Sequence, residues 1–146
     1  KSDFAKRHPA GAIGSTMLVQ IKDIMRTGNR HAVIAENRTV KDALLAMTRA
    51  RSGAISVVNP RGRLAGVFTD GDFRRHISRD PAFAELDAPI RTVMTRAPIT
   101  VRDTALAVEA LKVFQQRRID DLIVVDEKYR PVGVIDSQDL PKFKIM

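Results

Sequence analysis

Thr69 and Asp72 have the residue types and spacing of a binding motif. They stand in the stretch GVFTDGDFRRHI (66–77), where a short apolar run meets a threonine and an aspartate follows three positions later. At the start of a helix, the free amides and the helix dipole favour an anion such as a phosphate. The same pair fits a capping box, which needs no ligand and contributes on the order of 1 kcal/mol. The motif alone therefore fits both half of a nucleotide site and a plain helix cap.

Two arginines directly follow this motif. Arg74 or Arg75 could reach a bound phosphate as a charge-assisted donor, although either one taken alone is more often a solvated side chain. The three histidines, His8, His31 and His76, are far apart in the sequence and lack the spacing of metal ligands. We therefore expect anion binding, with no metal site and no required cofactor.

The net charge of +8 makes nucleic acid a partner to consider. No run of basic residues is longer than two, however, and aromatic residues make up 5% of the chain, with no tryptophan. Neither a clustered phosphate-binding patch nor a base-stacking platform is expected from this composition. The diffuse charge favours small phosphorylated anions, and nucleic-acid binding ranks last.

The 146 residues suffice for one compact domain, or for two very small ones that share a core. No apolar run approaches the ~18 residues of a membrane span, and the N-terminus lacks the pattern of a signal peptide. The absence of cysteine excludes disulfides and thiolate catalysis, and it fits a reducing compartment. We therefore expect a cytoplasmic protein that does not associate with membranes.

Most of the sequence occurs twice, at an offset of 67 positions. The matched stretches are DALLAM (42–47) with EALKVF (109–114), SVVN (56–59) with IVVD (123–126), and GVFTDGDF (66–73) with GVIDSQDL (133–140). Upstream, IKDIM ends at Met25 and IRTVM ends at Met94, so the first copy has two extra residues after its methionine. Self-similarity at a fixed period indicates a repeated structural unit.

Each copy predicts the same elements. An i, i+3, i+4, i+7 apolar pattern predicts a helix in both copies: Val40, Ala43, Leu44 and Met47 in the first, and Ala107, Ala110, Leu111 and Phe114 in the second. Two β-rich runs and a second helix follow. The resulting β-α-β-β-α unit of about sixty residues is too small to bury both faces of its sheet alone. We expect an α+β fold with two such units packed sheet to sheet around a pseudo-two-fold axis.

From Val19 to Met146 the ordered set of elements resembles a tandem pair of CBS domains, with the first at 19–80 and the second at 88–146. The resemblance implies that a nucleotide binds between the halves. The threonine and helix start then meet a phosphate, and the aspartate three residues on holds ribose hydroxyls. It also implies that Gly53 and Ala54 let a base or ribose approach the backbone. The implied nucleotide-binding residues are Thr69, Asp72, Gly53, Ala54, Arg74 and, in the second copy, Asp139.

The two copies differ at the position where the phosphate would bind. Asp136 replaces Thr69 in the second copy, and it is as good a helix cap. An ionised Asp136 would repel a phosphate. We therefore expect the first copy to be the working site.

The stretch DFAKRHPAGAIGSTML (3–18) resembles the linker between the sugar isomerase domain and the CBS pair of bacterial arabinose-5-phosphate isomerases, with departures at Ala10 and Ile13. The resemblance implies that residues 1–18 connect to an N-terminal isomerase domain of a tetrameric enzyme that supplies the lipopolysaccharide sugar Kdo from ribulose 5-phosphate. His8 would serve catalysis only within that parent enzyme. The chain itself is expected to have no catalytic residue.

The leading hypothesis is a non-catalytic regulatory module whose ligand is AMP, ATP or CMP-Kdo. Its partners would be its own isomerase domain and a second CBS pair. The alternative is a structural module that holds the oligomer together and binds no ligand.

Overall fold

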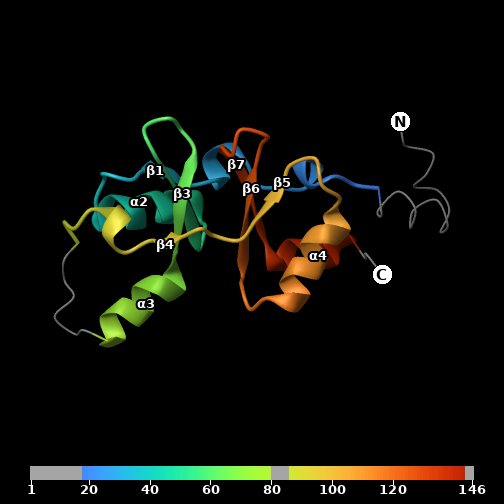
Figure 1. Cartoon of the computed structure of the whole chain (residues 1–146). Helices are drawn as coiled ribbons and strands as arrows, with labels where there is room; N and C mark the ends of the chain where they lie inside the picture. Colours follow the sequence, from blue (N-terminus) through green and yellow to red (C-terminus); the bar gives the residue numbers. More distant parts are fainter. Residues whose placement is uncertain (1–17, 80–85, 144–146) are drawn as a thin grey trace.

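The computed structural model describes residues 18–79 and 86–143, which form two β-sheets with helices on their outer sides (Figure 1). The first sheet has the order β1 (Val33–Ala35), β2 (Ala54–Val58), β3 (Leu64–Thr69) and β4 (Thr95–Arg96). The second sheet has the order β5 (Thr100–Arg102), β6 (Asp121–Val125) and β7 (Pro131–Asp136). In each sheet the first pair of strands is parallel and the hairpin that follows is antiparallel. The two predicted hairpins are confirmed.

The strand registers show that the copies have the same internal structure. Ser56 pairs with Val67 in the first hairpin and Ile123 pairs with Val134 in the second, which is the same pairing shifted by 67 positions. A register irregularity follows Val57 in one hairpin and Val124 in the other. The sequence offset is therefore reproduced in the backbone pairing, including its bulge.

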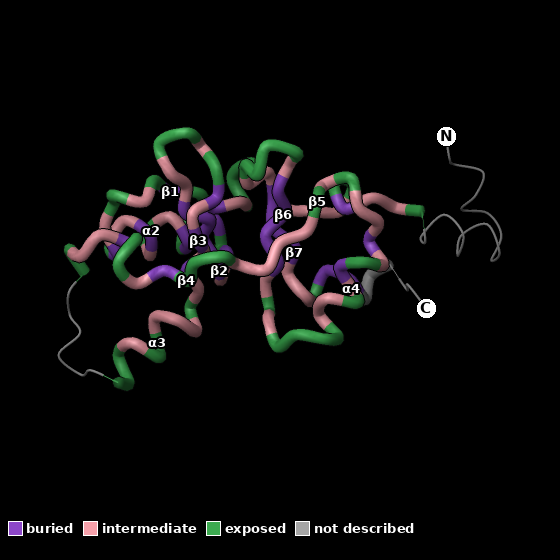
Figure 2. Tube along the Cα trace, viewed as in Figure 1, coloured by how far each residue is buried: buried purple, intermediate pink, exposed green. Residues whose placement is uncertain are grey.

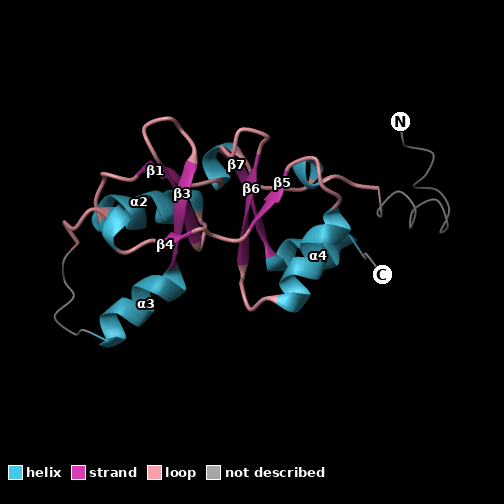
Figure 3. Ribbon diagram, in the orientation of Figure 1, coloured by secondary structure: helices cyan, strands magenta, loops and turns pink. Residues whose placement is uncertain are grey.

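The amphipathic helices form as predicted. They are α2 (Val40–Ala50) and α4 (Ala107–Gln116), which pack on the first and second sheet respectively (Figure 3). Thr39 and Asp42 form a reciprocal capping box at the start of α2. Short 3₁₀ turns occupy the segments that precede the first strand of each copy: η2 (Ile21–Asp23), η3 (Gly28–Arg30) and η4 (Ile90–Thr92).

The last helices of the two copies differ. The first copy ends in the α-helix α3 (Asp70–Arg79), whereas the second ends in the 3₁₀ helix η5 (Ser137–Phe143). Pro141 has no amide hydrogen with which to close an α-helical bond onto Ser137, and proline in a helix interior disfavours the α form. The expectation of equivalent exit helices is thus met only in part.

The two sheets pack against each other through a small apolar cluster. Leu64 of β3 contributes from the first sheet, Ile123 and Val125 from β6, and Val134 from β7, with Val67 partly buried beside them. Figure 2 shows the buried residues concentrated on the strands and on the inner sides of α2 and α4. The predicted sheet-to-sheet packing is confirmed.

The segment that leads into each copy packs against the other copy. Ile90 is fully buried in the core of the first repeat, and β4, which follows it, pairs with β3. Conversely, Ile21 is fully buried in the core of the second repeat, and Arg26 forms a bridge with Val134 of β7. This exchange is not visible in the sequence, which places each leading segment next to its own copy.

Candidate nucleotide-binding cleft

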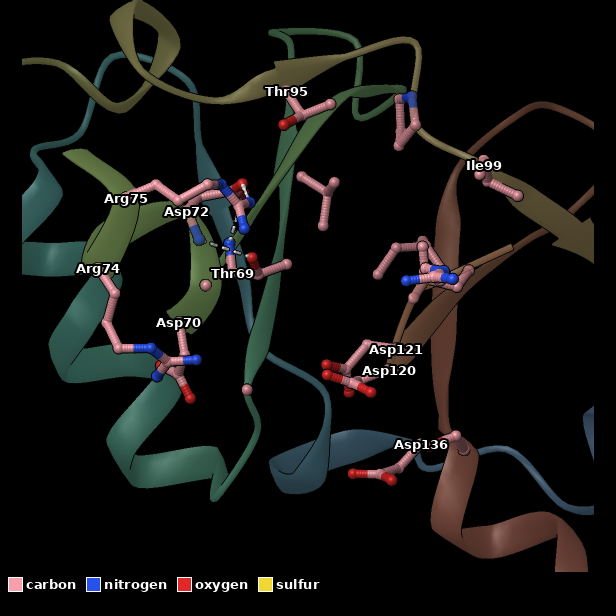
Figure 4. Close-up of a pocket in the computed structure, with 18 of the residues that line it drawn as sticks. Thr69, Asp70, Asp72, Arg74, Arg75, Thr95, Ile99, Asp120, Asp121 and Asp136 are labelled. Carbon is pink, nitrogen blue, oxygen red and sulfur yellow. Dashed lines mark hydrogen bonds and ion pairs between the residues drawn. The ribbon is translucent and has the colours of Figure 1, made fainter. Parts of the chain in front are cut away.

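A cleft of about 810 Å³ lies between the two repeats. Its walls come from three parts of the chain, which Figure 4 shows around the open space. The first repeat supplies Gly53, Val67, Thr69, Asp70, Gly71, Asp72, Arg74 and Arg75; the second supplies Arg118, Ile119, Asp120, Asp121, Ile123, Asp136, Ser137 and Gln138; the connecting segment supplies Thr95, Ala97, Pro98 and Ile99. A cleft built from both repeats is large enough for a nucleotide-sized ligand.

Thr69 and Asp72 stand together on the first wall, where β3 ends and α3 begins. The amide of Asp72 donates to Thr69 Oγ1 at 3.1 Å, and the amide of Thr69 donates to Asp72 Oδ2 at 3.0 Å. The predicted capping box is therefore confirmed. The other carboxylate oxygen of Asp72 accepts from Arg75. A ribose hydroxyl that bound to Asp72 would therefore compete with Arg75 for this carboxylate oxygen.

Gly53 lies where the carboxylates of the two repeats approach each other. A Cβ placed on Gly53 would lie 3.3 Å from Asp70 Oδ2 and 3.4 Å from Asp121 Oδ2. The amide of Asp70 donates to the Gly53 carbonyl at 3.0 Å, which fixes the start of α3 beside the start of β2. A larger residue at position 53 would narrow the cleft at this point.

Ala54 and Asp139 are not among the residues that line the cleft. Ala54 is 2% exposed, and it pairs with Thr69 across the hairpin. Its role is therefore to hold Thr69 in the sheet, and its side chain does not line the cleft. Asp139 is also buried, and its carboxylate accepts from Arg26 Nε at 3.1 Å and from Arg26 Nη2 at 2.9 Å. The structure thus brings Thr69, Asp72, Gly53 and Arg74 to one cleft and places Asp139 in an ion pair.

The family model for the CBS domain matches residues 21–79 and, a second time, residues 90–143. The chain belongs to the CBS domain family. Arabinose 5-phosphate isomerase KdsD of Pseudomonas aeruginosa is similar to this CBS pair, with 39% identity over 144 residues. That match covers 99% of this chain and 44% of the isomerase, so the CBS pair spans less than half the length of this relative.

Solved CBS structures share the fold. CBSX2 of Arabidopsis thaliana, in a structure with AMP, has a TM-score of 0.70 and 20% identity, with 87% of this chain and 96% of that chain covered. The CBS domain pair of protein MJ0100, in complex with 5′-methylthioadenosine and S-adenosyl-L-methionine, has a TM-score of 0.70 and 23% identity over the same shares. At these identities the likeness establishes the fold of the CBS pair.

The charges of the cleft are unevenly distributed. The first wall carries Arg74 and Arg75 together with Asp70 and Asp72, whereas the second wall carries Arg118 together with Asp120, Asp121 and Asp136. Burial, together with the nearby carboxylates of Asp136 and Asp120, raises the pKa of Asp121 to about 6. On the first wall, the start of α3 and the two arginines offer a place for an anionic group, and the excess of carboxylates on the second wall suits hydrogen-bond donors such as hydroxyls and amines.

Sequence reasoning missed Arg118, Asp120 and Asp121 as residues of the cleft. The offset of 67 positions carries a usable signal, because it places Asp120 and Asp121 where the first copy has Gly53 and Ala54. The backbone confirms the equivalence: Ser137 donates to the carbonyl of Asp120 as Asp70 donates to that of Gly53. The positions equivalent to Gly53 and Ala54 in the second copy therefore point to these two carboxylates.

Of the described histidines, neither His31 nor His76 is among the residues that line the cleft. His8 lies outside the described residues. His31 is partly buried, which lowers its pKa, and its Nε2 is 3.3 Å from Ser56 Oγ, while His76 stacks on Phe68. In residues 18–79 and 86–143, no three His, Cys, Asp or Glu side chains are grouped so as to hold a metal ion. Over the same residues, no helix has the length and apolar character needed to cross a bilayer.

Proposed function

We propose that this CBS pair is a non-catalytic regulatory module that binds a nucleotide in the cleft between its repeats. The observation that carries the proposal is the position of Thr69, Asp72 and Arg74 on a wall of a cleft of about 810 Å³, at the start of a ten-residue helix. The dipole of this helix favours an anion such as a phosphate at its start. Ligand binding would shift the equilibrium between two arrangements of the repeats only by the difference in the ligand's affinity for them.

The parent protein is proposed to be a cytoplasmic arabinose-5-phosphate isomerase of Kdo and lipopolysaccharide biosynthesis. The support is the 39% identity to KdsD across almost the whole CBS pair. In this proposal residues 1–18 are the linker, the isomerase domain is the partner, and two CBS pairs associate within a tetramer. His8 would approach the active site of the isomerase domain.

The distribution of charge favours one orientation of the ligand. The phosphate would meet Thr69, Arg74 and Arg75, and the ribose hydroxyls would replace Arg75 on Asp72. The remainder of the ligand would then face the acidic second wall. An adenine amino group can donate to that wall, whereas the carboxylate of CMP-Kdo would be repelled by it. We therefore rank AMP and ATP above CMP-Kdo, and the AMP complex of CBSX2 supports the nucleotide class.

A thermal-shift panel with AMP, ATP, CMP and CMP-Kdo tests this function. A ligand that binds only the folded state raises the melting temperature, by an amount that grows with its concentration relative to Kd. AMP should raise the melting temperature of the wild-type chain and leave that of Asp72→Asn nearly unchanged. An absence of any shift with all four ligands would contradict the nucleotide proposal.

The alternative is a structural module that holds the oligomer together, and one observation favours it. None of the described residues of α3 is buried, and Ile77 on this helix is 41% exposed. Figure 1 shows α3 extending away from the first sheet. Sedimentation equilibrium tests this surface: if α3 forms a contact between chains, the mean mass of Ile77→Glu should fall below that of the wild-type chain. The thermal-shift panel then distinguishes the two functions, because a purely structural module shows no shift with any of the four ligands.

A further inference from the structure

Arg26 holds the position in the second repeat that Thr95, an uncharged residue, holds in the first. It directly follows Met25, as Thr95 directly follows Met94. Arg26 bridges Val134 and Thr95 pairs with Val67, which are equivalent positions in the two hairpins. The two residues therefore hold the same place relative to their sheets. Thr95 lines the open cleft, whereas Arg26 carries a guanidinium group into the equivalent region of the second repeat.

The guanidinium group binds the aspartate that corresponds to Asp72. Arg26 Nε and Nη2 each donate to one oxygen of Asp139, at 3.1 and 2.9 Å, which is the bidentate geometry of a strong ion pair. Arg26 Nη1 lies 3.9 Å from Asp136 Oδ2. The side chains of Arg26 and Asp139 are 23% and 12% exposed, so both charges are largely removed from solvent.

The equivalent ion pair in the first repeat is more exposed and more local. Asp72 accepts from Arg75, which stands three positions later on the same helix and whose side chain is 60% exposed. An exposed pair of this kind contributes little to stability and yields readily to a competitor. Breaking a largely buried pair costs much more, because it leaves one charge buried without its partner.

We infer that Arg26 is an internal occupant of the second repeat, holding the Asp139 carboxylate in place of a ligand, so that each CBS pair binds one nucleotide rather than two. This inference rests on the proposed function for the count of nucleotides. It also gives a second reason why only the first repeat would bind a nucleotide: Asp136 would repel the phosphate, and Arg26 already holds the aspartate that would bind the ribose. Arg26 belongs to the segment that leads into the first repeat and packs against the second, so a residue of the first copy fills the second copy's site.

Calorimetry with AMP on the wild-type chain, Asp136→Thr and Asp139→Asn tests the count. The wild type should bind one AMP per chain. Asp136→Thr restores the Thr-x-x-Asp pattern but leaves Arg26 on Asp139, so it should still bind one. Asp139→Asn should bind AMP within about twofold of the wild-type Kd, whereas Asp72→Asn should weaken it tenfold or more. Two AMP per chain in the wild type or in Asp136→Thr, or an Asp139→Asn variant as weak as Asp72→Asn, would overturn the inference.

A double-mutant cycle measured by thermal melting tests, without any ligand, whether Arg26 holds Asp139. Arg26→Gln should lower the melting temperature by about 5 °C or more, because Asp139 stays buried without its cation. The double variant Arg26→Gln/Asp139→Asn should recover part of this loss, since two neutral amides replace the broken pair. Arg38→Gln is the matched control, because its pair with Asp42 is exposed. Strictly additive losses in the cycle would overturn the inference.

The two measurements separate the failures. If the wild type binds no AMP, the proposed function fails, and the melting cycle alone decides whether Arg26 holds Asp139. If the wild type binds AMP but Asp136→Thr gains a second site, the proposed function stands and the inference fails.

Discussion

Gly66 of β3 lies directly beneath Met94, the last residue before β4. A Cβ placed on Gly66 would lie 2.6 Å from Met94 Sδ and 2.7 Å from the carbonyl oxygen of Thr95. Gly133 has the same relationship to Met25, with a distance of 2.5 Å to Sδ. The glycine and methionine that mark the repeat in the sequence therefore form two equivalent contacts, each between residues of different copies. These contacts hold the segment that leads into each copy against the sheet of the other copy.

Gly66→Ala should destabilise the fold by about 1–3 kcal/mol, because the added methyl group overlaps a backbone carbonyl that must then shift. Urea unfolding should show a lower midpoint for Gly66→Ala than for the wild type. Gly71→Ala is the matched control, since its Cβ would meet the flexible end of Arg75 at 3.2 Å. Equal midpoints for the two variants would show that β4 does not hold this close contact.

Asp72→Asn should weaken AMP binding by about tenfold to a hundredfold. Hydrogen bonds from ribose hydroxyls to a charged acceptor contribute about 1.5–3 kcal/mol, and the amide lacks that charge. Calorimetry measures the loss, and a thermal melt without ligand measures the part that comes from the weakened cap. If Asp72→Asn binds AMP as tightly as the wild type, the ribose is not held by this residue.

Asp121→Asn should make the folded chain more stable at neutral pH but not at pH 4. The pKa of Asp121 is raised to about 6, from an ordinary value of 3.8, chiefly by burial. The native state therefore keeps a proton that the unfolded state has lost, and stability falls as pH rises from about 4 to about 6. The full shift corresponds to about 3 kcal/mol, and we expect about 1–2 kcal/mol at pH 7.5 because the carboxylate is partly solvated. Urea unfolding at both pH values measures the difference.

Asp126→Asn supplies the opposite sign as a control. Hydrogen bonds from the Arg130 amide, followed by the Arg130 side chain and the Lys128 amide, lower the pKa of Asp126. Its contribution is present above its ordinary pKa and is lost as pH falls through the lowered value. Asp126→Asn should therefore reduce stability at pH 7.5. If both variants shift stability in the same direction, burial is not the cause of the Asp121 effect.

The isolated CBS pair should show no turnover of arabinose 5-phosphate. It corresponds to 44% of the length of KdsD, and its cleft presents a helix start and carboxylates suited to binding. A coupled assay for ribulose 5-phosphate, run beside a full-length isomerase, measures this. Activity in the isolated chain would contradict the assignment of a non-catalytic module.

The repeat, the hairpins and the helices α2 and α4 could be predicted from the sequence because their signals are local. The apolar spacing within Val40–Ala50 and the paired β-rich runs specify their own elements, and an offset of 67 positions predicts that they occur twice. The Thr69 and Asp72 capping box was predictable for the same reason, since both of its bonds span three residues.

The tertiary structure alone decided which copy each leading segment joins and what Asp139 does. Arg26 and Asp139 are 113 positions apart, and no local pattern relates them. Their contact requires the chain to cross between repeats, which is favourable because Ile21 and Ile90 are then fully buried in the opposite cores. The acidic second wall of the cleft depends on the same packing, because Asp121 comes within reach of Gly53 and Asp70 only when the two sheets meet. Local periodicity specifies the helices and strands of this protein. The packing of segments that are distant in the sequence decides which charged side chains line the cleft, such as Asp121, and which form ion pairs outside it, such as Asp139.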